Sequence, residues 1–317
     1  MKLTDAYFPY SFPAELADCV CCPRECHADR TAGSGGYCKS DAFPGVGSIC
    51  LHKGEEPVIG GEWGICNVFF GRCNLQCIYC QNCQISSRTE AIHIEYQRLD
   101  SIVQAISKLL DDGCKAVGFV SPSHMVPQML AIIKALNDSG RKPVIVYNSN
   151  GYDSVETLKR LEGIVDVYLP DLKYMDSHLA NEYSDAGNYV SVARMALKEM
   201  FRQKGTALIT DDAGQALSGL IIRHLVLPGN VENSINVLRF IAEELSHGIH
   251  ISLMSQYFPM PAVAGHPLLG RALSEMEYKL VVEEMEALGL FKGWIQEVGS
   301  SDSYLPDFCF EHPFEKY

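Results

Sequence analysis

The chain has 317 residues, 47% of them hydrophobic, which is enough to bury a substantial core as one large α/β domain, with or without a small appendage. Its formal net charge of −13 and the lack of any Lys/Arg-rich run exclude a surface built to neutralise nucleic-acid phosphates or an anionic membrane. No stretch approaches the roughly 20 apolar residues needed to cross a bilayer, and Met1–Phe12 lacks the pattern of a secretory signal, so we expect a cytoplasmic protein.

Residues 1–64 are predicted to form a small loop-rich lobe, because Gly, Pro and Cys are dense from position 19 to 64 and no periodicity persists there. Four of its thiols belong to Cys19, Cys22, Cys26 and Cys38, a set large enough for a structural zinc site or an iron–sulfur cluster. Reduced, partly buried cysteines are the alternative, and Cys21 leaves the ligand register open.

Residues 65–317 alternate short β-branched or apolar runs with amphipathic helical patterns, the rhythm of repeated βα units around a mostly parallel sheet. The predicted strands are Cys66–Phe70, Ala116–Val120, Val144–Asn148, Asp166–Pro170, Leu220–Leu227 and His250–Met254. The predicted helices are Leu99–Leu110, Val126–Leu136, Ser154–Leu161, Val190–Phe201, Val231–Leu245 and Ser274–Leu288. Six such units predict a partial (β/α)6 TIM-like barrel, whose reactive groups gather on the loops after the strand ends.

Three cysteines follow the first predicted strand at C-x3-C-x2-C spacing, namely Cys73, Cys77 and Cys80. A [4Fe-4S] cluster normally takes four cysteines, so three thiolates leave one iron open to a non-protein ligand. S-adenosylmethionine (SAM) can occupy that iron through its amino and carboxylate groups. Tyr79 lies between the last two ligands, and its aromatic face can pack beside the adenine.

Two other metal sites fit the same loop less well. Cys77, Cys80 and Cys83 have C-x2-C-x2-C spacing, which is found in bacterial ferredoxins, and if Cys73 and Cys83 both bound, no iron would be open. Tetrahedral zinc sites usually draw their ligands as two separated pairs of side chains. Buried free thiols do not explain three cysteines so close together in a polar loop.

With these motifs, residues 19–308 resemble the radical SAM superfamily and, within it, the pyruvate formate-lyase activating enzyme-like branch. Asn148 and Ser149 open an N-S-N-G segment similar to D-T-N-G of the activating enzymes, and Asp171 and Lys173 are similar to D-x-K. The resemblance implies that these loops hold the SAM carboxylate, with a monovalent cation on the acidic residues and Lys173 as counter-charge. Asn148 replaces the first Asp, which removes one formal charge.

Two further positions match the family's later strands. Arg223 stands where the activating enzymes have an Arg that faces SAM, and Tyr257 stands where they have a His near the nucleoside. Without the family, Arg223 would need a buried acidic partner, because an unpaired buried Arg is costly. Asp171 and Lys173 would then form a rim ion pair worth little to stability.

These residues predict an oxygen-sensitive oxidoreductase that cleaves SAM to methionine and a 5′-deoxyadenosyl radical, which removes hydrogen from a protein or peptide, such as a glycine of a partner enzyme. Reduction of the cluster implies a flavodoxin- or ferredoxin-type electron donor. One alternative keeps this chemistry but acts on a small metabolite. Another is an iron–sulfur electron carrier or redox sensor that never cleaves SAM.

Overall fold

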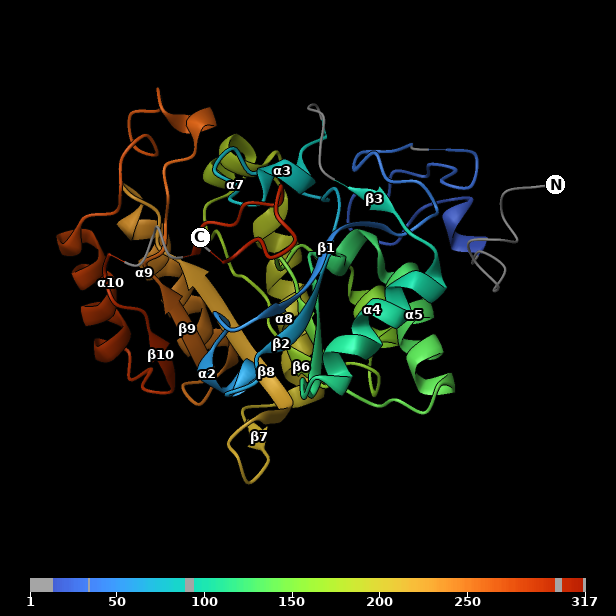
Figure 1. Ribbon diagram of the computed structural model, residues 1–317. Helices are drawn as coiled ribbons and strands as arrows, with labels where there is room; N and C mark the ends of the chain where they lie inside the picture. The colour runs from blue at the N-terminus through green and yellow to red at the C-terminus, as the bar shows by residue number, and fades with distance from the viewer. Residues whose placement is uncertain (1–13, 34, 89–93, 300–303, 316–317) are drawn as a thin grey trace.

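The computed structural model describes residues 14–33, 35–88, 94–299 and 304–315 (Figure 1). Its described strands form one ten-stranded sheet in the order β10-β9-β8-β6-β5-β4-β2-β1-β3, with β7 paired to β8. The six central strands run parallel. They are β2 (Ile65–Phe70), β4 (Ala116–Val120), β5 (Val144–Asn148), β6 (Val167–Tyr168), β8 (Ala216–Leu225) and β9 (His250–Met254). The sheet does not close, which confirms the expected partial barrel.

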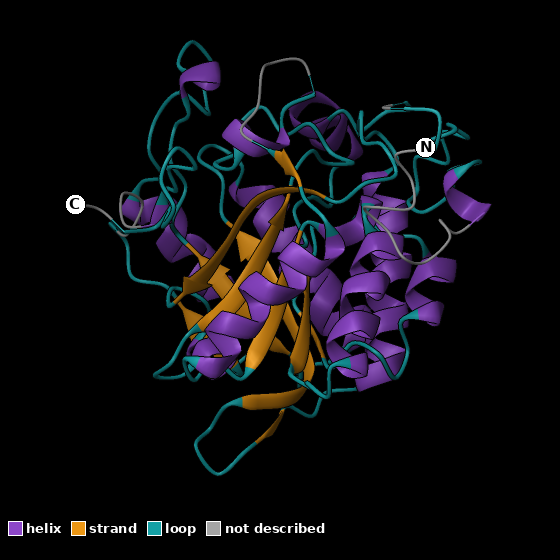
Figure 2. Ribbon diagram, turned by 45° about the vertical axis from the view of Figure 1, so that its right-hand side comes forward, coloured by secondary structure: helices purple, strands orange, loops and turns teal. Residues whose placement is uncertain are grey.

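Helices between the strands cover the sheet, as Figure 2 shows. They are α4 (Leu99–Asp111), α5 (Val126–Asp138), α6 (Val155–Arg160), α8 (Tyr189–Lys204), α9 (Val231–Phe240), which continues as the π-helix η3 (Ile241–Leu245), and α10 (Glu275–Ala287). Each lies where helical periodicity predicts it. The start of α10 is fixed by a capping box, in which Ser274 and Glu277 satisfy each other's backbone N–H groups.

Two strands, β6 and β8, differ by two or more residues from the sequence prediction. β6 is shorter than Asp166–Pro170, because the Asp166 carboxylate accepts a hydrogen bond from the Ile145 backbone N–H at 2.8 Å and Pro170 has no N–H to donate. β8 begins before Leu220, because its first residues pair with β7 (Ile209–Thr210) in a hairpin.

An antiparallel strand that sequence periodicity does not reveal extends the sheet beyond β2. β1 (Gly45–His52) pairs with β2 from Val46↔Phe70 to His52↔Ile65, and β3 (Glu95–Tyr96) pairs in turn with β1. The expected boundary between residues 64 and 65 therefore falls between two paired strands. Glycines and a serine interrupt the apolar alternation of β1, which hides the strand in the sequence.

The remaining described elements are short. They are β10 (Gly293–Ile295), which pairs in parallel with β9, the helices α2 (Pro57–Gly60), α3 (Cys83–Ser86) and α7 (Ser177–Ser184), and the 3-10 turns η1 (Ala14–Leu16), η2 (Pro122–His124) and η4 (Pro261–Val263). No helix in the described ranges is both long enough and apolar enough to span a bilayer. Met1–Phe12, in which no secretory signal is expected, lies outside the described residues.

Residues 14–44 form the loop-rich lobe and pack against the barrel through two arginines. The Arg24 side chain donates to the backbone oxygens of Asn74, at 2.9 Å, and Asp185, at 2.6 Å. The buried Arg30 side chain donates to the backbone oxygen of His124 at 2.6 Å. The lobe is therefore joined directly to the loops that follow β2 and β4.

Gly118 in β4 provides a test of the barrel interior, because a methyl group there would overlap the side-chain oxygen of Asn67. We expect Gly118→Ala to lower the free energy of unfolding by about 1–3 kcal/mol through overpacking, measured by urea denaturation. Gly265→Ala is the control, since nothing lies within 4 Å of the added atom. Equal stability of the two variants would contradict the close packing of β4 against β2.

Candidate functional site

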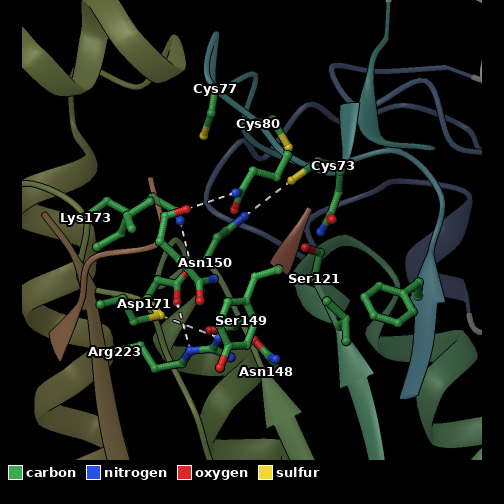
Figure 3. Close-up of a pocket in the computed structure, with 18 of the residues that line it drawn as sticks. Cys73, Cys77, Cys80, Ser121, Asn148, Ser149, Asn150, Asp171, Lys173 and Arg223 are labelled. Carbon is green, nitrogen blue, oxygen red and sulfur yellow. Dashed lines mark hydrogen bonds and ion pairs between the residues drawn. The ribbon is translucent and has the colours of Figure 1, made fainter. Parts of the chain in front are cut away.

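A pocket at the carboxyl ends of the parallel strands brings the three predicted cluster ligands together (Figure 3). Cys73, Cys77 and Cys80 all line this pocket. Cys83 does not; it begins α3 and lines a neighbouring groove, which it shares with Cys77 and Cys80. The structure therefore groups the C-x3-C-x2-C cysteines on one cavity and sets Cys83 apart from it.

The three thiols receive hydrogen bonds or polar contacts from the surrounding loops. The Leu75 backbone N–H and the Asn150 side-chain amide each lie 3.4 Å from the Cys73 sulfur. The Ser184 hydroxyl donates to the Cys77 sulfur at 3.0 Å, and the Ser86 hydroxyl lies 3.3 Å from the Cys80 sulfur. These donors would stabilise thiolates, so the loop suits cysteines that bind metal as anions.

Burial raises the pKa of the Cys73 thiol to about 12 and that of the Cys77 thiol to about 11. Metal binding must therefore displace protons from both sulfurs. No three His, Cys, Asp or Glu side chains in the described part of the chain are arranged around a single metal ion. Cysteines that hold a cubane bind different iron atoms and need not converge on one point, so the three thiols can hold a cluster without surrounding a single metal ion.

Tyr79 lines the pocket and anchors its loop through a chain of hydroxyl groups. Its hydroxyl lies 2.6 Å from that of Tyr174, which lies 2.7 Å from the Ser184 hydroxyl, the donor to Cys77. Its side chain is buried, so the ring is fixed in position beside the cysteines.

The last residue of β5, Asn148, and the first two residues of the following loop, Ser149 and Asn150, line the pocket. The Asn150 amide contacts the Cys73 sulfur and also donates to the Asn74 side-chain oxygen at 2.8 Å, a positioning role that sequence reasoning did not assign to it. The Ser149 hydroxyl donates to the Asp153 carboxylate at 2.6 Å. Gly151 has a positive φ of 74°, and a methyl group there would overlap the Asp171 backbone oxygen.

Asp171 and Lys173 follow β6 and form an ion pair on the same wall, with 2.6 Å between the carboxylate oxygen and the ammonium nitrogen. Both side chains are largely buried. Burial by itself would lower the pKa of Lys173, but the charges of Asp171 and Cys77 outweigh it and raise that pKa. Lys173 therefore stays positively charged beside the cysteines.

Arg223, in β8, lies at the floor of the pocket among three carboxylates. It is 3.1 Å from an oxygen of Glu55, 3.4 Å from Glu56 and 3.7 Å from Asp171. Burial opposes the charge of Arg223, but these acids, Glu56 first, raise its pKa. The buried acidic partner that Arg223 requires is thus present, while Arg223 still lines the pocket.

Glu55 and Glu56 are the main functional candidates that the sequence did not reveal. Glu55 accepts a hydrogen bond from the Asn67 side chain at 2.9 Å and lies 3.5 Å from the Asn148 amide. Its carboxylate therefore lies beside Asn148, the position at which the activating enzymes have a charged Asp and this chain has a neutral Asn. Burial raises the pKa of Glu56, although Arg223 opposes the shift. The only signal in the sequence is an acidic pair before Pro57 in an otherwise irregular segment.

Tyr257 does not join the other predicted residues in the pocket. Its side chain is buried, and its hydroxyl donates to the Leu269 backbone oxygen at 2.6 Å. Gln256, the preceding residue, lines the pocket in its place. The chain direction after β9 therefore turns Tyr257 into the core, where its ring lies 6.2 Å from that of Tyr79.

Comparisons with known proteins agree with a cluster-binding partial barrel. Residues 59–187 match the model of the family described as a 4Fe-4S single cluster domain, and this span contains the three cysteines. The chain is 29% identical over 280 residues to the uncharacterized protein MJ0674 of Methanocaldococcus jannaschii, covering 86% of this chain and 75% of that protein.

One solved structure extends the comparison to the fold, and a second aligns over a shorter part of this chain. HydG, a maturase of the [FeFe]-hydrogenase, aligns with a TM-score of 0.50 and 12% identity over 75% of this chain, which spans 53% of HydG. A domain of a pyruvate-formate lyase-activating enzyme from Bacteroides vulgatus aligns over 54% of this chain and 93% of its own length, with 17% identity and a TM-score of 0.39. HydG and this chain therefore share a fold, and the activating-enzyme branch stays a prediction.

The buried ion pairs of Arg223 predict a stability effect at Glu55. Glu55→Gln keeps the shape of the side chain but removes its charge, and Arg223 then loses its nearest anion. We expect the free energy of unfolding to fall by about 1–3 kcal/mol, measured by urea denaturation. Glu62→Gln, at an exposed position, should change it by less than about 0.5 kcal/mol. An unchanged Glu55→Gln stability would show that the pair does not hold β8 to the β1–α2 loop.

Proposed function

We propose that this chain is a radical SAM enzyme. The observation that carries the proposal is that Cys73, Cys77 and Cys80 all line one pocket at the strand ends, whereas Cys83 lines only the neighbouring groove. Three thiolates would hold three corners of a [4Fe-4S] cluster and leave the fourth iron open. When bound, the cluster and SAM would supply reductive cleavage of SAM to methionine and a 5′-deoxyadenosyl radical.

In this proposal the side chains of the pocket position the charged groups of SAM. Lys173 stays protonated beside the cysteines and is the counter-charge for the SAM carboxylate. Arg223 provides a second fixed positive charge on the same wall. Tyr79 offers a buried aromatic face beside the cluster loop.

The proposal includes a monovalent cation near the end of β5. Side-chain oxygens of Asn148, Ser149 and Asp171 would bind it. Glu55 lies next to Asn148, and its carboxylate provides the negative charge that Asn148 lacks. A carboxylate from the loop after β1 would thus take over the electrostatic role of an Asp at the end of β5.

We propose a protein or peptide as the substrate of the radical. The support is a groove beside the cluster loop, lined by Cys77 and Cys80 and by apolar side chains such as Phe258, Met260 and Leu305. These apolar walls favour a substrate with apolar side chains, such as a peptide, over a strongly polar metabolite. An electron donor of the flavodoxin or ferredoxin type would reduce the cluster. We also propose that the chain belongs to the activating-enzyme branch of the radical SAM superfamily.

The proposal predicts a defined product from SAM. After anaerobic reconstitution with iron and sulfide, the protein should convert SAM to 5′-deoxyadenosine when dithionite is added, as measured by liquid chromatography with mass spectrometry. Omitting dithionite is the control and should stop product formation. A reconstituted protein that holds a cluster at Cys73, Cys77 and Cys80 but releases no 5′-deoxyadenosine would instead be an electron carrier or redox sensor.

The ligand register predicts opposite results for two neighbouring cysteines. Cys80→Ser should lower 5′-deoxyadenosine formation at least 100-fold, because it removes a cluster ligand, and should lower the iron content. Cys83→Ser should keep most of the activity and iron, because Cys83 lies outside the cluster pocket. Loss of both properties in Cys83→Ser would assign Cys83 as a ligand and leave no iron open to SAM.

A further inference from the structure

Backbone hydrogen bonds connect the turns of the loop-rich lobe, which is drawn as the dark blue loops of Figure 1. The Cys19 backbone N–H donates to the Ala28 oxygen, and the His27 N–H donates to the Cys19 oxygen, both at 3.1 Å. These two bonds hold Cys19 against His27 and Ala28, and Cys26 packs against the buried cluster that contains Cys19. The Glu25 N–H donates to the Cys22 oxygen at 3.0 Å and closes a tight turn between Cys22 and Cys26.

The loop that carries Cys38 packs onto the same cysteines. A methyl group on Gly36 would lie 2.5 Å from the Cys26 sulfur, so the two loops are in direct contact. Cys22 lies within electrostatic range of Cys19, Cys26 and Cys38. Cys19, Cys22 and Cys38 are almost completely buried. Four thiols from three turns therefore share one interior region.

Unusual backbone conformations follow two of these cysteines. His27, after Cys26, has a φ of 52°, and Lys39, after Cys38, has a φ of 58°. Residues other than glycine are uncommon in this left-handed region, and such strain clusters at functional sites and ligand clamps. The backbone is therefore strained directly after Cys26 and directly after Cys38.

Arg30 adds an electrostatic argument, because it is 1% exposed and has no carboxylate within 4 Å in the described part of the chain. Its guanidinium donates to the backbone oxygens of Asp41 and His124, and lies 3.2 Å from the Met125 sulfur and 3.9 Å from the Cys19 sulfur. A buried cation that is not paired with a nearby anion is costly. The Asp41 carboxylate interacts with Arg30 only at longer range, and the sulfurs of Cys19, Cys21 and Cys38 are further groups near Arg30 that can become anions.

The lobe has little apolar packing with which to hold this arrangement. Its buried hydrophobic cluster consists of Leu16, Cys19, Cys21 and Ala42, with Cys26 packed against it. Small units with so few buried side chains usually need a covalent or metal cross-link. All thirteen cysteines are free thiols in this structure, so no disulfide supplies that cross-link.

We propose that Cys19, Cys22, Cys26 and Cys38 bind a second metal centre, an anionic tetrathiolate of zinc or of an iron–sulfur cluster, and that Arg30 balances its negative charge. On binding, each thiol loses its proton to solvent and its sulfur forms one bond to metal, with no change of oxidation state in the protein. The side chains do not yet surround a single point, so metal binding also reorients them.

The proposed centre has a structural consequence for the neighbouring pocket. Arg24, in the turn between Cys22 and Cys26, donates to the Asn74 backbone oxygen, next to Cys73. Arg30 donates to the His124 backbone oxygen, and the His124 ring contacts the Gly71 oxygen at 3.0 Å. A metal bound in the lobe would therefore also hold in place the two contacts, one through Arg24 and one through Arg30 and His124, that connect the lobe to the cluster loop.

The test separates the two metal sites in the full-length protein. The triple variant Cys73→Ser/Cys77→Ser/Cys80→Ser removes the ligands of the pocket, so any metal that remains reports on the lobe. We expect anaerobically purified triple variant to keep about one zinc, or the iron and sulfide of one cluster, per chain by elemental analysis. Visible absorption and Mössbauer spectra distinguish the cluster from zinc. This measurement does not depend on SAM cleavage, so failure of the proposed function leaves it unaffected.

Further substitutions in that background assign the ligands. Adding Cys22→Ser or Cys38→Ser should remove the remaining metal, whereas adding Cys21→Ser, a buried thiol in the same lobe, should leave it in place. A triple variant without metal, or metal content that survives both Cys22→Ser and Cys38→Ser, would overturn the proposal. Loss with Cys21→Ser and retention with Cys22→Ser would overturn the ligand assignment.

Unmutated protein provides a control against misfolding of the variants. The four lobe cysteines should resist iodoacetamide until a chelator removes the metal, and mass spectrometry should then find them alkylated. Cys50, which is buried in a different cluster, should resist alkylation before and after the chelator. Lobe cysteines whose reactivity does not change with the chelator would contradict metal binding.

Discussion

The ion pairs of Arg223 are the constraint on which the pocket depends. They join β8 to Glu55 and Glu56 in the loop after β1 and to Asp171 after β6. A buried charge without a partner is expensive, so these three segments must stay together once the barrel has formed. The same contacts leave the guanidinium lining the pocket, so the buried charges that hold the fold together are also the ones that the proposed function assigns to SAM.

The sequence was sufficient for the parts of the fold that repeat. Parallel strands covered by helices read as apolar runs, and β4, β5 and β9 begin and end where those runs predict. The cysteine spacing likewise predicted that the loop after β2 carries the candidate cluster ligands Cys73, Cys77 and Cys80. β1 was missed because a short antiparallel strand with glycines has neither pattern, and its pairing with β2 and β3 cannot be deduced from the local sequence.

The site residues that escaped prediction act across long sequence separations. Glu55 meets Asn148 and Arg223 only because β1 returns alongside β2, and Asn150 reaches Cys73 only because β5 lies close to the cluster loop. Nothing in the local sequence encodes such contacts. Tyr257 is the opposite case. A motif match placed it near the SAM nucleoside, but the turn after β9 directs its side chain into the core.

Gly151 lies where two loops approach each other closely, and this packing alone can make the position as intolerant of substitution as a catalytic residue. Its Cα stands against the Asp171 backbone oxygen, and its φ of 74° suits glycine. Any larger residue would push Asp171 away from Lys173 and Arg223, two of the charged groups in the pocket. A mutational scan would therefore score position 151 as intolerant as a catalytic residue, although glycine has no side chain that could take part in a reaction.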